Sequence, residues 1–469
     1  MNPAQATSLP DGLLLAYYGD DFTGASAVME VMTFAGLPTV LFLDIPTPDQ
    51  LARLAGYRGI GIAGIARSQA PEWMERELPG IFAALGALGA PVTQYKICST
   101  LDSSPHIGSI GKALDIAIPI LSGREGAADW QPMVVAAPAI RRYQAFGNLF
   151  AGLGNEYFRL DRHPVMARHP VTPMDEADVR RHVARQTERA IGLVDLVAMK
   201  SGRAQVVLDL ERASERKLVA LDVIDEETLA IAGSLIWSNR AGGIFTIGSQ
   251  GIEYALVEHW RQNGSLPETA PATRARPVEQ IVAVSGSVSS VTAGQIETAQ
   301  HDGFELARID AAAAIDPKRW QIELARALQQ ATNIVESGKS PVVATAVGPD
   351  DPAISRLNAA IEGNDISAAA LNQRIGEGLG AVLDGLYRRT GIRRAAVLGG
   401  DTSGHATRAL GIHALEALAP ITPGCPLCRA YSDDPAKDGM EIALKGGQMG
   451  DQNFLQAVRA GGAIEQRSS

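Results

Sequence analysis

Two segments near the start of the chain combine carboxylates, hydroxyls and a lysine directly after an apolar run. In Gly19–Ala25, the adjacent carboxylates of Asp20 and Asp21 could cap a helix, hold Mg²⁺ or orient a substrate hydroxyl. In Lys96–Ser103, a lysine is followed by several hydroxyl side chains, a set that suits a carboxylate or a phosphate. Taken singly, an ordinary helix N-cap explains the first segment about as well, and a solvated lysine before a capping run explains the second better.

Three glycine-rich segments in the second half of the chain have the composition of phosphate-binding turns. Ser285–Ser290 (SGSVSS) offers hydroxyls and backbone N–H groups, and its glycine permits a tight turn. Leu398–Gly404 (LGGDTSG) places bare N–H groups at the start of an expected helix, where Asp401 could orient a ribose or a metal ion. Leu444–Asp451 (LKGGQMGD) repeats the pattern with a lysine. A lone SGS is common in loops, but two glycine-rich strand ends in one domain indicate nucleotide binding.

Three other matches lack the context that their chemistry needs. Gly59–Gly64 fits the G-x-G-x-x-G pattern but lies inside a strand-like run, so it is not a dinucleotide fingerprint. Residues 338–340 (GKS) end like a Walker A loop, yet a strand rather than a helix is expected after them. Cys425 and Cys428 have the spacing of redox or zinc ligands, but no second pair exists, so a structural turn is favoured. No protein metal site is predicted.

These segments need strands that end just before them and helices that begin just after them. Apolar, β-branched runs alternate with stretches of helical period along the whole chain. The expected strands are Leu13–Tyr18, Thr39–Leu43, Gly59–Ile65, Val92–Ile97, Met133–Ala136, Gln205–Leu208, Gly243–Ile247, Ile281–Val284, Pro341–Ala346, Ala395–Leu398 and Glu441–Leu444. The expected helices are Phe22–Ala35, Glu72–Leu88, Gly108–Leu121, Asp175–Thr187, Glu226–Ser238, Val291–Gln300, Lys318–Glu336, Asn372–Arg389 and Ser403–Ala417. The alternation predicts an α/β fold with mainly parallel sheets that are covered by helices on both faces.

A change of composition near residue 270 divides this alternation. Residues 263–277 hold three prolines and little periodic apolar character, which is typical of a linker. We therefore expect two α/β domains, at residues 1–262 and 280–469, with a linker at 263–279. Ligands of open parallel sheets bind beyond the carboxyl ends of the strands, where the segments described above lie.

Composition and charge limit the partners. The 469-residue chain has 42 Lys plus Arg and 52 Asp plus Glu, a formal net charge of −10. A nucleic-acid partner is not expected, because its phosphates call for a basic excess, whereas a few local cations can still bind an anionic small molecule. The first basic residue is Arg53, and no apolar run reaches the about 18 residues of a membrane span. We expect a cytoplasmic protein with no membrane partner, and a homo-oligomer stays open.

The N-terminal segments resemble elements of the four-carbon acid sugar kinase family. Gly19–Ala25 resembles the family's DDxTGA element, and Lys96 with Ser99-Thr100-Leu101 resembles its K-x-x-STL element. The C-terminal segments continue the resemblance in the same order. Ser285–Ser287 with Thr292 and Gln295 resembles SGS-x-x-x-x-T-x-x-Q, and Gly399–Thr402 resembles GG[DE]T. The resemblance spans about residues 13–456, and the ordered set is specific even though each piece is not.

This resemblance implies an N-terminal domain that binds an acid sugar and a C-terminal domain that binds ATP. It also implies a ligand cleft between the domains, with phosphoryl transfer across it to a terminal hydroxyl of substrates such as D-threonate or D-erythronate. Asp20 or Asp21 would then orient or deprotonate the acceptor hydroxyl. The expected substrate-binding residues are Thr23, Arg67, Ser68, Lys96, Ser99 and Thr100. The expected ATP-binding residues are Ser285, Ser287, Gly399, Gly400, Asp401, Thr402, Gly446 and Gly447, with Mg²⁺ as the accompanying ion.

The chain departs from the threonate and erythronate pattern near the expected acid pocket. The family usually places Arg-Gly after STL, whereas Asp102 and Ser103 follow here, and Cys98 replaces the family's Asp before STL. The loss of a cation argues against a plain four-carbon aldonate. Residues 446–450 (GGQMG) and Gly424–Cys428 resemble the branch of the family that includes 3-oxo-isoapionate kinases.

The resulting hypothesis is an ATP- and Mg²⁺-dependent sugar-acid kinase. The alternative is a catalytically silent sugar-acid sensor on the same fold, which the changes at Cys98 and Asp102 motivate. Retention of both glycine-rich nucleotide loops argues against the sensor. A nicotinamide-dependent oxidoreductase ranks last, because no Rossmann fingerprint stands between a strand and a helix.

Overall fold

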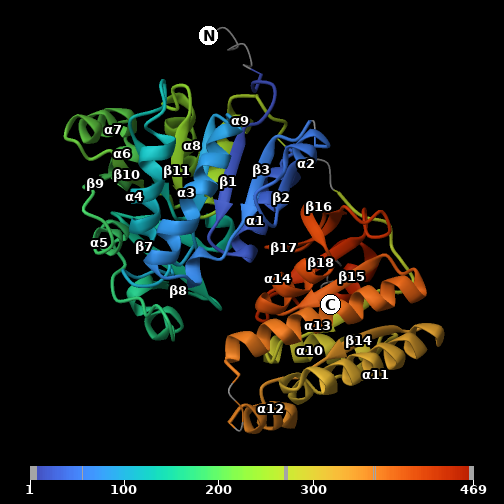
Figure 1. Cartoon of the computed structure of the whole chain (residues 1–469). Helices are drawn as coiled ribbons and strands as arrows, with labels where there is room; N and C mark the ends of the chain where they lie inside the picture. The colour runs from blue at the N-terminus through green and yellow to red at the C-terminus, as the bar shows by residue number, and fades with distance from the viewer. Residues whose placement is uncertain (1–7, 55, 269–272, 363, 365, 464–469) are drawn as a thin grey trace. The chain divides into compact units, whose positions relative to one another are not determined.

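The structure is a computed structural model, and it describes residues 8–54, 56–268, 273–362, 364 and 366–463, except for the side chains of Ala369 and Asp401. The chain divides into two units, residues 1–271 and 272–469, which are blue to yellow-green and yellow to red in Figure 1. The predicted linker at 263–279 includes residues 269–272, which lie outside the described residues. The two units are described separately below.

The N-terminal unit is built on a parallel sheet in the order β2-β3-β1-β4-β11-β5-β10-β9. Its strands are β1 (Leu15–Gly19), β2 (Thr39–Phe42), β3 (Gly59–Ala63), β4 (Val92–Lys96), β5 (Gln131–Val134), β9 (Ile191–Val194), β10 (Leu218–Leu221) and β11 (Ile244–Gly248). A separate antiparallel sheet consists of β6 (Arg142–Ala145), β7 (Asn148–Leu153) and β8 (Glu156–Arg159). The helices are α1 (Phe22–Phe34), α2 (Pro48–Ala52), α3 (Pro71–Ala87), α4 (Ile110–Leu121), α5 (Val179–Ala184), α6 (Leu196–Lys200), α7 (Ala204–Ala213), α8 (Glu226–Ser238) and α9 (Gly251–Gln262).

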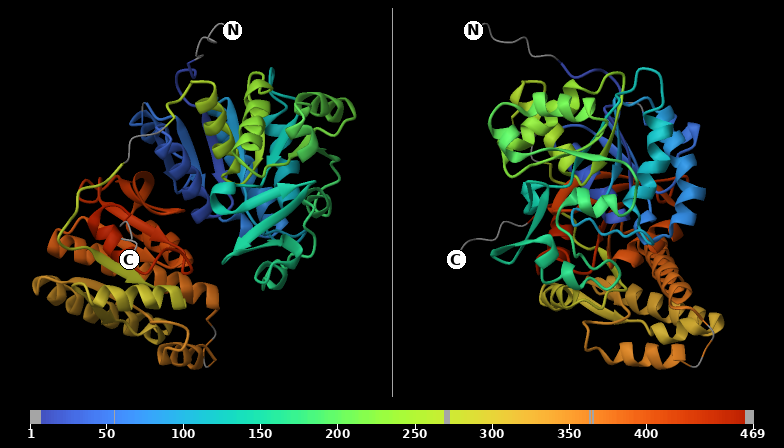
Figure 2. Two further views of the ribbon diagram at one scale, coloured as in Figure 1. Left: turned by 180° about the vertical axis from the view of Figure 1, so that it is seen from behind. Right: turned by 90° about the vertical axis from the view of Figure 1, so that its left-hand side faces the viewer.

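Helices pack on both faces of the parallel sheet, as the right-hand view in Figure 2 shows. On one face α3 packs beside α4, and on the other α8 packs beside α9. The first face has an aromatic core, in which Tyr18 of β1 stacks on Tyr95 of β4 and meets the edge of Phe82 of α3 at centroid distances of 6.1 and 6.5 Å. Burial on both faces explains why the strands are nearly continuous apolar runs in the sequence.

The C-terminal unit has a mixed sheet in the order β13-β14-β12-β15-β18-β17-β16, in which β17 runs antiparallel to both of its neighbours and the other pairs are parallel. Its strands are β12 (Val282–Ser285), β13 (Phe304–Arg308), β14 (Ser340–Ala344), β15 (Arg394–Leu398), β16 (Ile412–Thr422), β17 (Cys425–Ser432) and β18 (Glu441–Lys445). Its helices are α10 (Ser290–Gln300), α11 (Pro317–Glu336), α12 (Pro352–Glu362), α13 (Ala368–Thr390), α14 (Gly400–Ala409) and α15 (Phe454–Ala460). Helices α11 and α13 lie side by side (Figures 1 and 2).

The predicted α/β class with mainly parallel sheets is confirmed, but three local predictions are wrong. Residues 205–208 lie in helix α7, because the buried Ala204 and Leu208 are four residues apart, which is a helical spacing. The predicted helix 403–417 ends at Ala409, since Gly411 is in the left-handed conformation (φ 70°) and β16 follows it. The Cys425–Cys428 segment is not a turn but the beginning of β17.

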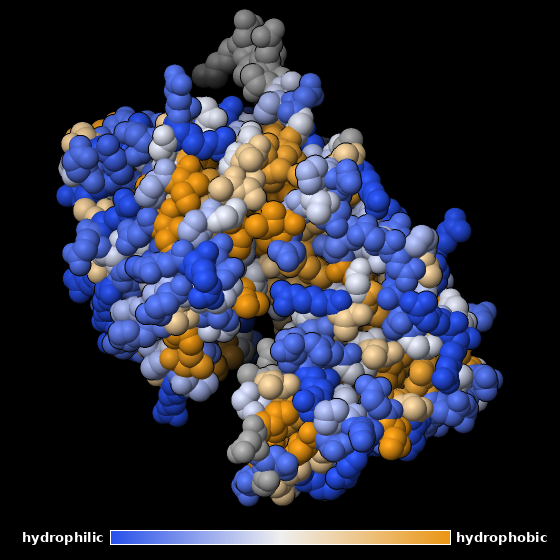
Figure 3. Space-filling view, in the orientation of Figure 1, coloured by the Kyte–Doolittle hydropathy of each residue, from blue (hydrophilic) through white to orange (hydrophobic). Residues whose placement is uncertain are grey.

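No helix in the described part of the chain combines the length and the apolar character needed to cross a bilayer. On the face drawn in Figure 3, hydrophilic residues surround separate apolar patches.

Candidate active site

Backbone hydrogen bonds bring three loops together at the carboxyl edge of the N-terminal sheet. The N–H of Asp20, just after β1, donates to the carbonyl of Lys96 at the end of β4 (2.9 Å). The N–H of Arg67, in the 3-10 turn Ala66–Ser68 after β3, donates to the carbonyl of Asp20 (3.0 Å). Because β1 lies between β3 and β4, these bonds place three charged side chains at one edge.

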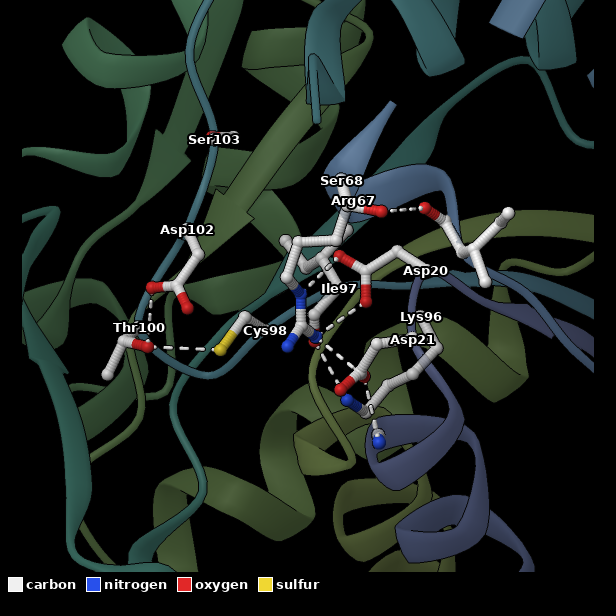
Figure 4. Close-up of polar contacts among 12 residues, drawn as sticks. Asp20, Asp21, Arg67, Ser68, Lys96, Ile97, Cys98, Thr100, Asp102 and Ser103 are labelled. Atoms are coloured by element: carbon white, nitrogen blue, oxygen red, sulfur yellow. Dashed lines mark hydrogen bonds and ion pairs between the residues drawn. The ribbon is translucent and has the colours of Figure 1, made fainter. Parts of the chain in front are cut away.

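Arg67 joins the two predicted catalytic aspartates. Its Nη2 donates to Oδ1 of Asp20 (2.6 Å) and to Oδ1 of Asp21 (2.7 Å), and its Nε donates to Oδ2 of Asp20 (3.2 Å). Figure 4 shows the guanidinium between the two carboxylates and Cys98. The Asp20 side chain is 3% exposed and that of Asp21 is 29% exposed. The buried aspartate therefore holds Arg67 with both oxygens, while the outer one remains accessible.

Burial and charge shift the protonation of this cluster. Burial raises the pKa of Asp20 and Arg67 lowers it, while the neighbouring Asp21 raises it further, with a net upward shift. For Arg67, burial lowers the pKa, but Asp20, Cys98 and Asp21 outweigh it and the pKa is raised. A guanidinium that is held charged between two carboxylates fixes their orientation.

The start of helix α1 explains why this segment contains glycines. Asp21 is the N-cap of α1, and its Oδ1 accepts a hydrogen bond from the N–H of Gly24 (2.8 Å). A Cβ at Gly24 would lie 2.9 Å from Nζ of Lys96, and a Cβ at Gly19 would collide with Ala25. Lys96 is buried, and its ammonium donates to the carbonyl of Ile97 (2.8 Å). Absence of side chains at Gly19 and Gly24 thus lets the helix start approach the lysine closely.

The other predicted substrate-binding residues lie around this cluster with different degrees of access. Thr23 is half-buried in the first turn of α1, and Ser99 is half-buried after β4. Ser68 is exposed, and its hydroxyl donates to the carbonyl of Ile65 (3.0 Å), which is drawn in Figure 4.

A chain of hydrogen bonds runs from Cys98 through Thr100 to Asp102. Thr100 Oγ1 donates to Oδ1 of Asp102 (2.9 Å), and Cys98 Sγ lies 3.0 Å from the same hydroxyl (Figure 4). Since the single hydroxyl proton of Thr100 goes to Asp102, the Cys98 thiol is the donor to Thr100. Burial raises the pKa of Cys98, which favours this neutral thiol form.

Sequence reasoning missed a buried carboxyl group behind Lys96. Glu253 of α9 is 0% exposed, and burial raises its pKa to about 8, with Lys96 and Gln94 opposing the shift. The two Glu253 oxygens and Oε1 of Gln94 have no hydrogen-bond donor among the described residues. No sequence signal marks Glu253, because its environment comes from a strand more than 150 residues away.

The glycine-rich turns of the C-terminal unit also meet at one sheet edge. Ser285, Leu398 and Lys445 stand at the carboxyl ends of the adjacent strands β12, β15 and β18. The N–H of Gly286 donates to the carbonyl of Leu398 (3.1 Å), and that of Gly399 donates to the carbonyl of Lys445 (2.9 Å). The three predicted turns thus form one cluster.

Close approach of the turns depends on their glycines. A Cβ at Gly286 would collide with the Thr402 hydroxyl, and a Cβ at Gly447 would lie 2.8 Å from Oγ of Ser287. Gly399 has φ 123°, a value that side chains disfavour, and it precedes the first turn of α14 with no side-chain cap. The N–H groups that open α14 at Gly400 are consequently available to an anion. The side chain of Asp401 lies outside the described residues.

Two polar side chains of α10 hold the 446–451 loop against the serine turn. Thr292 Oγ1 donates to the carbonyl of Gly447 (2.9 Å), and Nε2 of Gln295 donates to the carbonyls of residues 449–451 (3.0 Å each). Lys445 Nζ donates to the carbonyl of Gly446 (3.0 Å) and to Thr292 Oγ1 (3.1 Å). Burial lowers the pKa of Lys445 to about 8.

A cavity of about 250 Å³ lies beside these turns. Gly286 and Thr402 line it. Further lining residues come from the residue just after β14 and from α12 and α13: Thr345, Ile354, Leu357, Asn372 and Ile375. Apolar walls with a few hydroxyl and amide groups suit a nucleobase or a ribose. The sequence gives no sign of this cavity, because its walls come from elements that are adjacent only in the folded unit.

Two family models match the chain, one in each unit. The model described as "Sugar-binding N-terminal domain" matches residues 15–256, and the one described as "Nucleotide-binding C-terminal domain" matches residues 282–455. A 3-oxo-isoapionate kinase from Paraburkholderia graminis is 47% identical over 460 residues, which are 98% of this chain and 97% of that protein. A 3-oxo-tetronate kinase from Methylobacterium radiotolerans is 30% identical over 94% of this chain and 98% of that protein.

Solved structures share the fold. The crystal structure of a Haemophilus influenzae protein of the DUF1537 family matches with a TM-score of 0.73 at 23% identity, over 95% of this chain and 99% of that one. A crystal structure from Salmonella typhimurium LT2 matches with a TM-score of 0.76 at 23% identity, over 95% and 98% of the two chains.

Proposed function

This chain belongs to the four-carbon acid sugar kinase family, and we propose that it transfers a phosphoryl group from ATP to a terminal hydroxyl of a 3-oxo-isoapionate-type acid. The observation that carries this proposal is the 47% identity to a 3-oxo-isoapionate kinase over 98% of the chain. The named relatives described above are kinases, and none favours the sensor alternative. The departures after Ser99-Thr100-Leu101 also support an acceptor other than a plain aldonate.

In this proposal the Asp20–Asp21–Arg67 cluster positions the acceptor hydroxyl. Among the described residues, hydrogen bonds to Asp21 involve only Oδ1, so its Oδ2 is the oxygen that faces the substrate. Asp20 uses both oxygens on Arg67 and keeps the cluster rigid. Asp21 accepts the hydroxyl proton as the new O–P bond forms and the bond between the γ-phosphorus and the β-phosphate oxygen breaks, releasing ADP. Lys96, Thr23, Ser99, Thr100 and Ser68 are proposed to surround the acid.

The cluster of glycine-rich turns is proposed to hold ATP. The N–H groups of Gly400, Gly446 and Gly447 and the hydroxyls of Ser285, Ser287 and Thr402 suit phosphate oxygens. Gly399, whose N–H is taken by the Lys445 carbonyl, shapes the turn, and Asp401 stands at the same turn. The adjacent cavity suits the adenosine part. Lys445 places a positive charge at this edge.

Mg²⁺ is proposed to enter with the nucleotide. Within the described residues, no group of three or more His, Cys, Asp or Glu side chains is placed to hold a metal ion. Mg²⁺ can bind with one or two protein ligands when phosphate oxygens and water supply the others, so the described residues fit an ion that arrives with ATP. Bound in this way, the ion neutralises phosphate charge during transfer.

An ADP-release assay with ATP and Mg²⁺ tests the proposal on 3-oxo-isoapionate, 3-oxo-tetronate, D-threonate, D-erythronate and L-threonate. The expected result is the highest kcat/KM on 3-oxo-isoapionate. A higher kcat/KM on 3-oxo-tetronate or on an aldonate would contradict the assignment of the acid while keeping the kinase. Calorimetric ATP binding without turnover on any acid would contradict the proposed substrate class.

A further inference from the structure

Arg142 is a cation at the carboxyl edge of the N-terminal sheet that the sequence did not mark. The substrate proposed above is an anion, and its carboxylate needs a cation whose donors are not already used. Arg67 meets this need only in part, because its Nη2 and Nε contact Asp20 and Asp21, and among the described residues Nη1 alone is left without a hydrogen bond. Whether Arg142 can bind the carboxylate depends on its position and on whether its N–H donors are free.

The backbone ties Arg142 to the strand ends that carry the candidate site. Arg142 is the first residue of β6, and it exchanges two backbone hydrogen bonds with Ala137 (2.9 and 3.2 Å), three residues after the end of β5. Strand β5 pairs with β11, whose Gly248 carbonyl accepts a hydrogen bond from the N–H of Ile97 (2.8 Å). Arg142 thus lies at the same edge as the loop that carries Lys96 and Cys98.

The donors of the Arg142 guanidinium are largely uncommitted. Nη1 donates to the carbonyls of Ile140 (3.1 Å) and Arg141 (3.2 Å). Nε is buried and has no hydrogen-bond partner, and no carboxylate forms an ion pair with Arg142, in the part of the chain that the structure describes. A guanidinium stays charged at physiological pH, so a partly buried one without a counter-ion is unfavourable until an anion binds.

The residues that face Arg142 belong to the predicted acid pocket. Burial lowers the pKa of Arg142, and the nearby Cys98 and Asp102 oppose this shift. Asp102 does not neutralise Arg142 through an ion pair, and its Oδ1 is already engaged by the Thr100 hydroxyl (2.9 Å). Asp102 also stands where the family usually has Arg-Gly after STL.

We propose that Arg142 binds the carboxylate of the sugar acid. The inference rests on the proposed sugar-acid kinase function and adds a substrate-binding residue to it. A planar guanidinium is a fork that matches a carboxylate. In Arg142, Nη2 makes no hydrogen bond among the described residues, and Nε, although buried, has no competing partner there.

Steady-state kinetics of R142Q and R142K test the inference, with R76Q as the control variant. Arg76 has the same side chain in the same unit, is 66% exposed and pairs with Glu77. Loss of a charge-assisted hydrogen bond should raise the KM for the acid about 10- to 100-fold in R142Q. The KM for ATP should change less than about twofold. R142K, which keeps the charge but not the fork, should lie between R142Q and the wild type, and R76Q should match the wild type.

A substrate analogue separates carboxylate binding from a structural role. The wild type should bind the primary amide of the acid about 10- to 100-fold more weakly than the acid by calorimetry, whereas R142Q should bind both alike. A KM for the acid within twofold of the wild type in R142Q, or an unchanged preference of R142Q for the acid over the amide, would overturn the inference. If R142Q does not fold, as judged by circular dichroism and ATP binding, the KM for the acid and the preference for the acid over the amide are measured in R142K instead. Values equal to those of the wild type in R142K would then overturn the inference.

The two proposals fail in different ways. The assays use whichever acid of the panel the wild type phosphorylates. An error in the proposed substrate therefore shows as missing wild-type turnover of 3-oxo-isoapionate, whereas an error about Arg142 shows only in the variants.

Discussion

Replacing Glu253 by glutamine should remove a pH dependence of stability that the fold imposes. Glu253 is fully buried behind Lys96, and its pKa rises from 4.5 to about 8 because burial disfavours the carboxylate. Glutamine has nearly the same shape and stays neutral at every pH. The E253Q variant therefore keeps the packing and removes the titration.

The sign and size of the effect follow from the two pKa values. Below pH 4.5 both the folded and the unfolded chain hold the proton, and the full stability is present. As the pH rises towards 8, the unfolded chain has released the proton and the folded chain still holds it. The free energy of unfolding then falls by about 1.4 kcal/mol per pH unit. Over the whole window the loss is on the order of 5 kcal/mol.

Urea denaturation followed by tryptophan fluorescence measures this effect. Four of the five tryptophans, Trp73, Trp130, Trp237 and Trp260, lie in the N-terminal unit together with Glu253. Between pH 5.5 and 7.5, the stability of E253Q relative to the wild type should increase by about 3 kcal/mol. The E258Q variant is the control, because Glu258 is half-buried on the same helix. Parallel pH profiles for E253Q and the wild type would refute the reasoning.

Four further substitutions address the two candidate sites. D21N should lower kcat by about 100-fold or more, because the hydroxyl loses its proton acceptor, and D20N should in addition lower the melting temperature, because it disrupts the bidentate pair with Arg67. G399A should raise the KM for ATP about tenfold, because alanine is strained at φ 123° and its Cβ would lie 3.0 Å from Thr402 Oγ1. Lys445, with a pKa of about 8, should lose its charge as the pH rises, so the KM for ATP should increase between pH 7 and 9 in the wild type and not in K445M.

Each of these substitutions has a specific readout. ATP binding by calorimetry should stay within twofold of the wild type in D21N, and full turnover in that variant would remove Asp21 from the mechanism. For G399A, an equal rise in the KM of the acid would mean a general loss of folding rather than a local effect on the turn. For K445M, a pH profile that still follows the wild type would assign the titration to another group.

The predictable parts of the fold are those that local sequence specifies. Helix α8 has the predicted bounds, Glu226–Ser238, and in the structure Asp225 and Thr228 form a capping box at its start. The strand ends that carry the Gly19, Lys96, Ser285 and Leu398 segments were also predicted to within a few residues. The structure of a strongly apolar run that ends in glycines or capping residues can be predicted from the residues of that segment alone.

Other elements depend on partners that are distant in the sequence. Strand β16 was predicted as part of a helix, yet it pairs with β17 in an antiparallel hairpin. Strands β6, β7 and β8 were not predicted, because their sequences (RYQA, NLFAGL and EYFR) contain no long apolar run. Pairing among the three strands supplies the missing stabilisation. The intrinsic strand propensity of these segments is weak, so contacts with other strands determine their secondary structure.

The sequence by itself determined which turns carry chemistry, because glycines, hydroxyls and carboxylates at strand ends have few other uses in such an order. Only the tertiary structure decided what each group does there. It joined Arg67 to Asp20 and Asp21 across more than 40 residues, placed Glu253 near Lys96, and brought Arg142 to the carboxyl edge of the N-terminal sheet. Charge pairing and desolvation depend on distances between side chains from different elements, and the order of residues does not contain those distances.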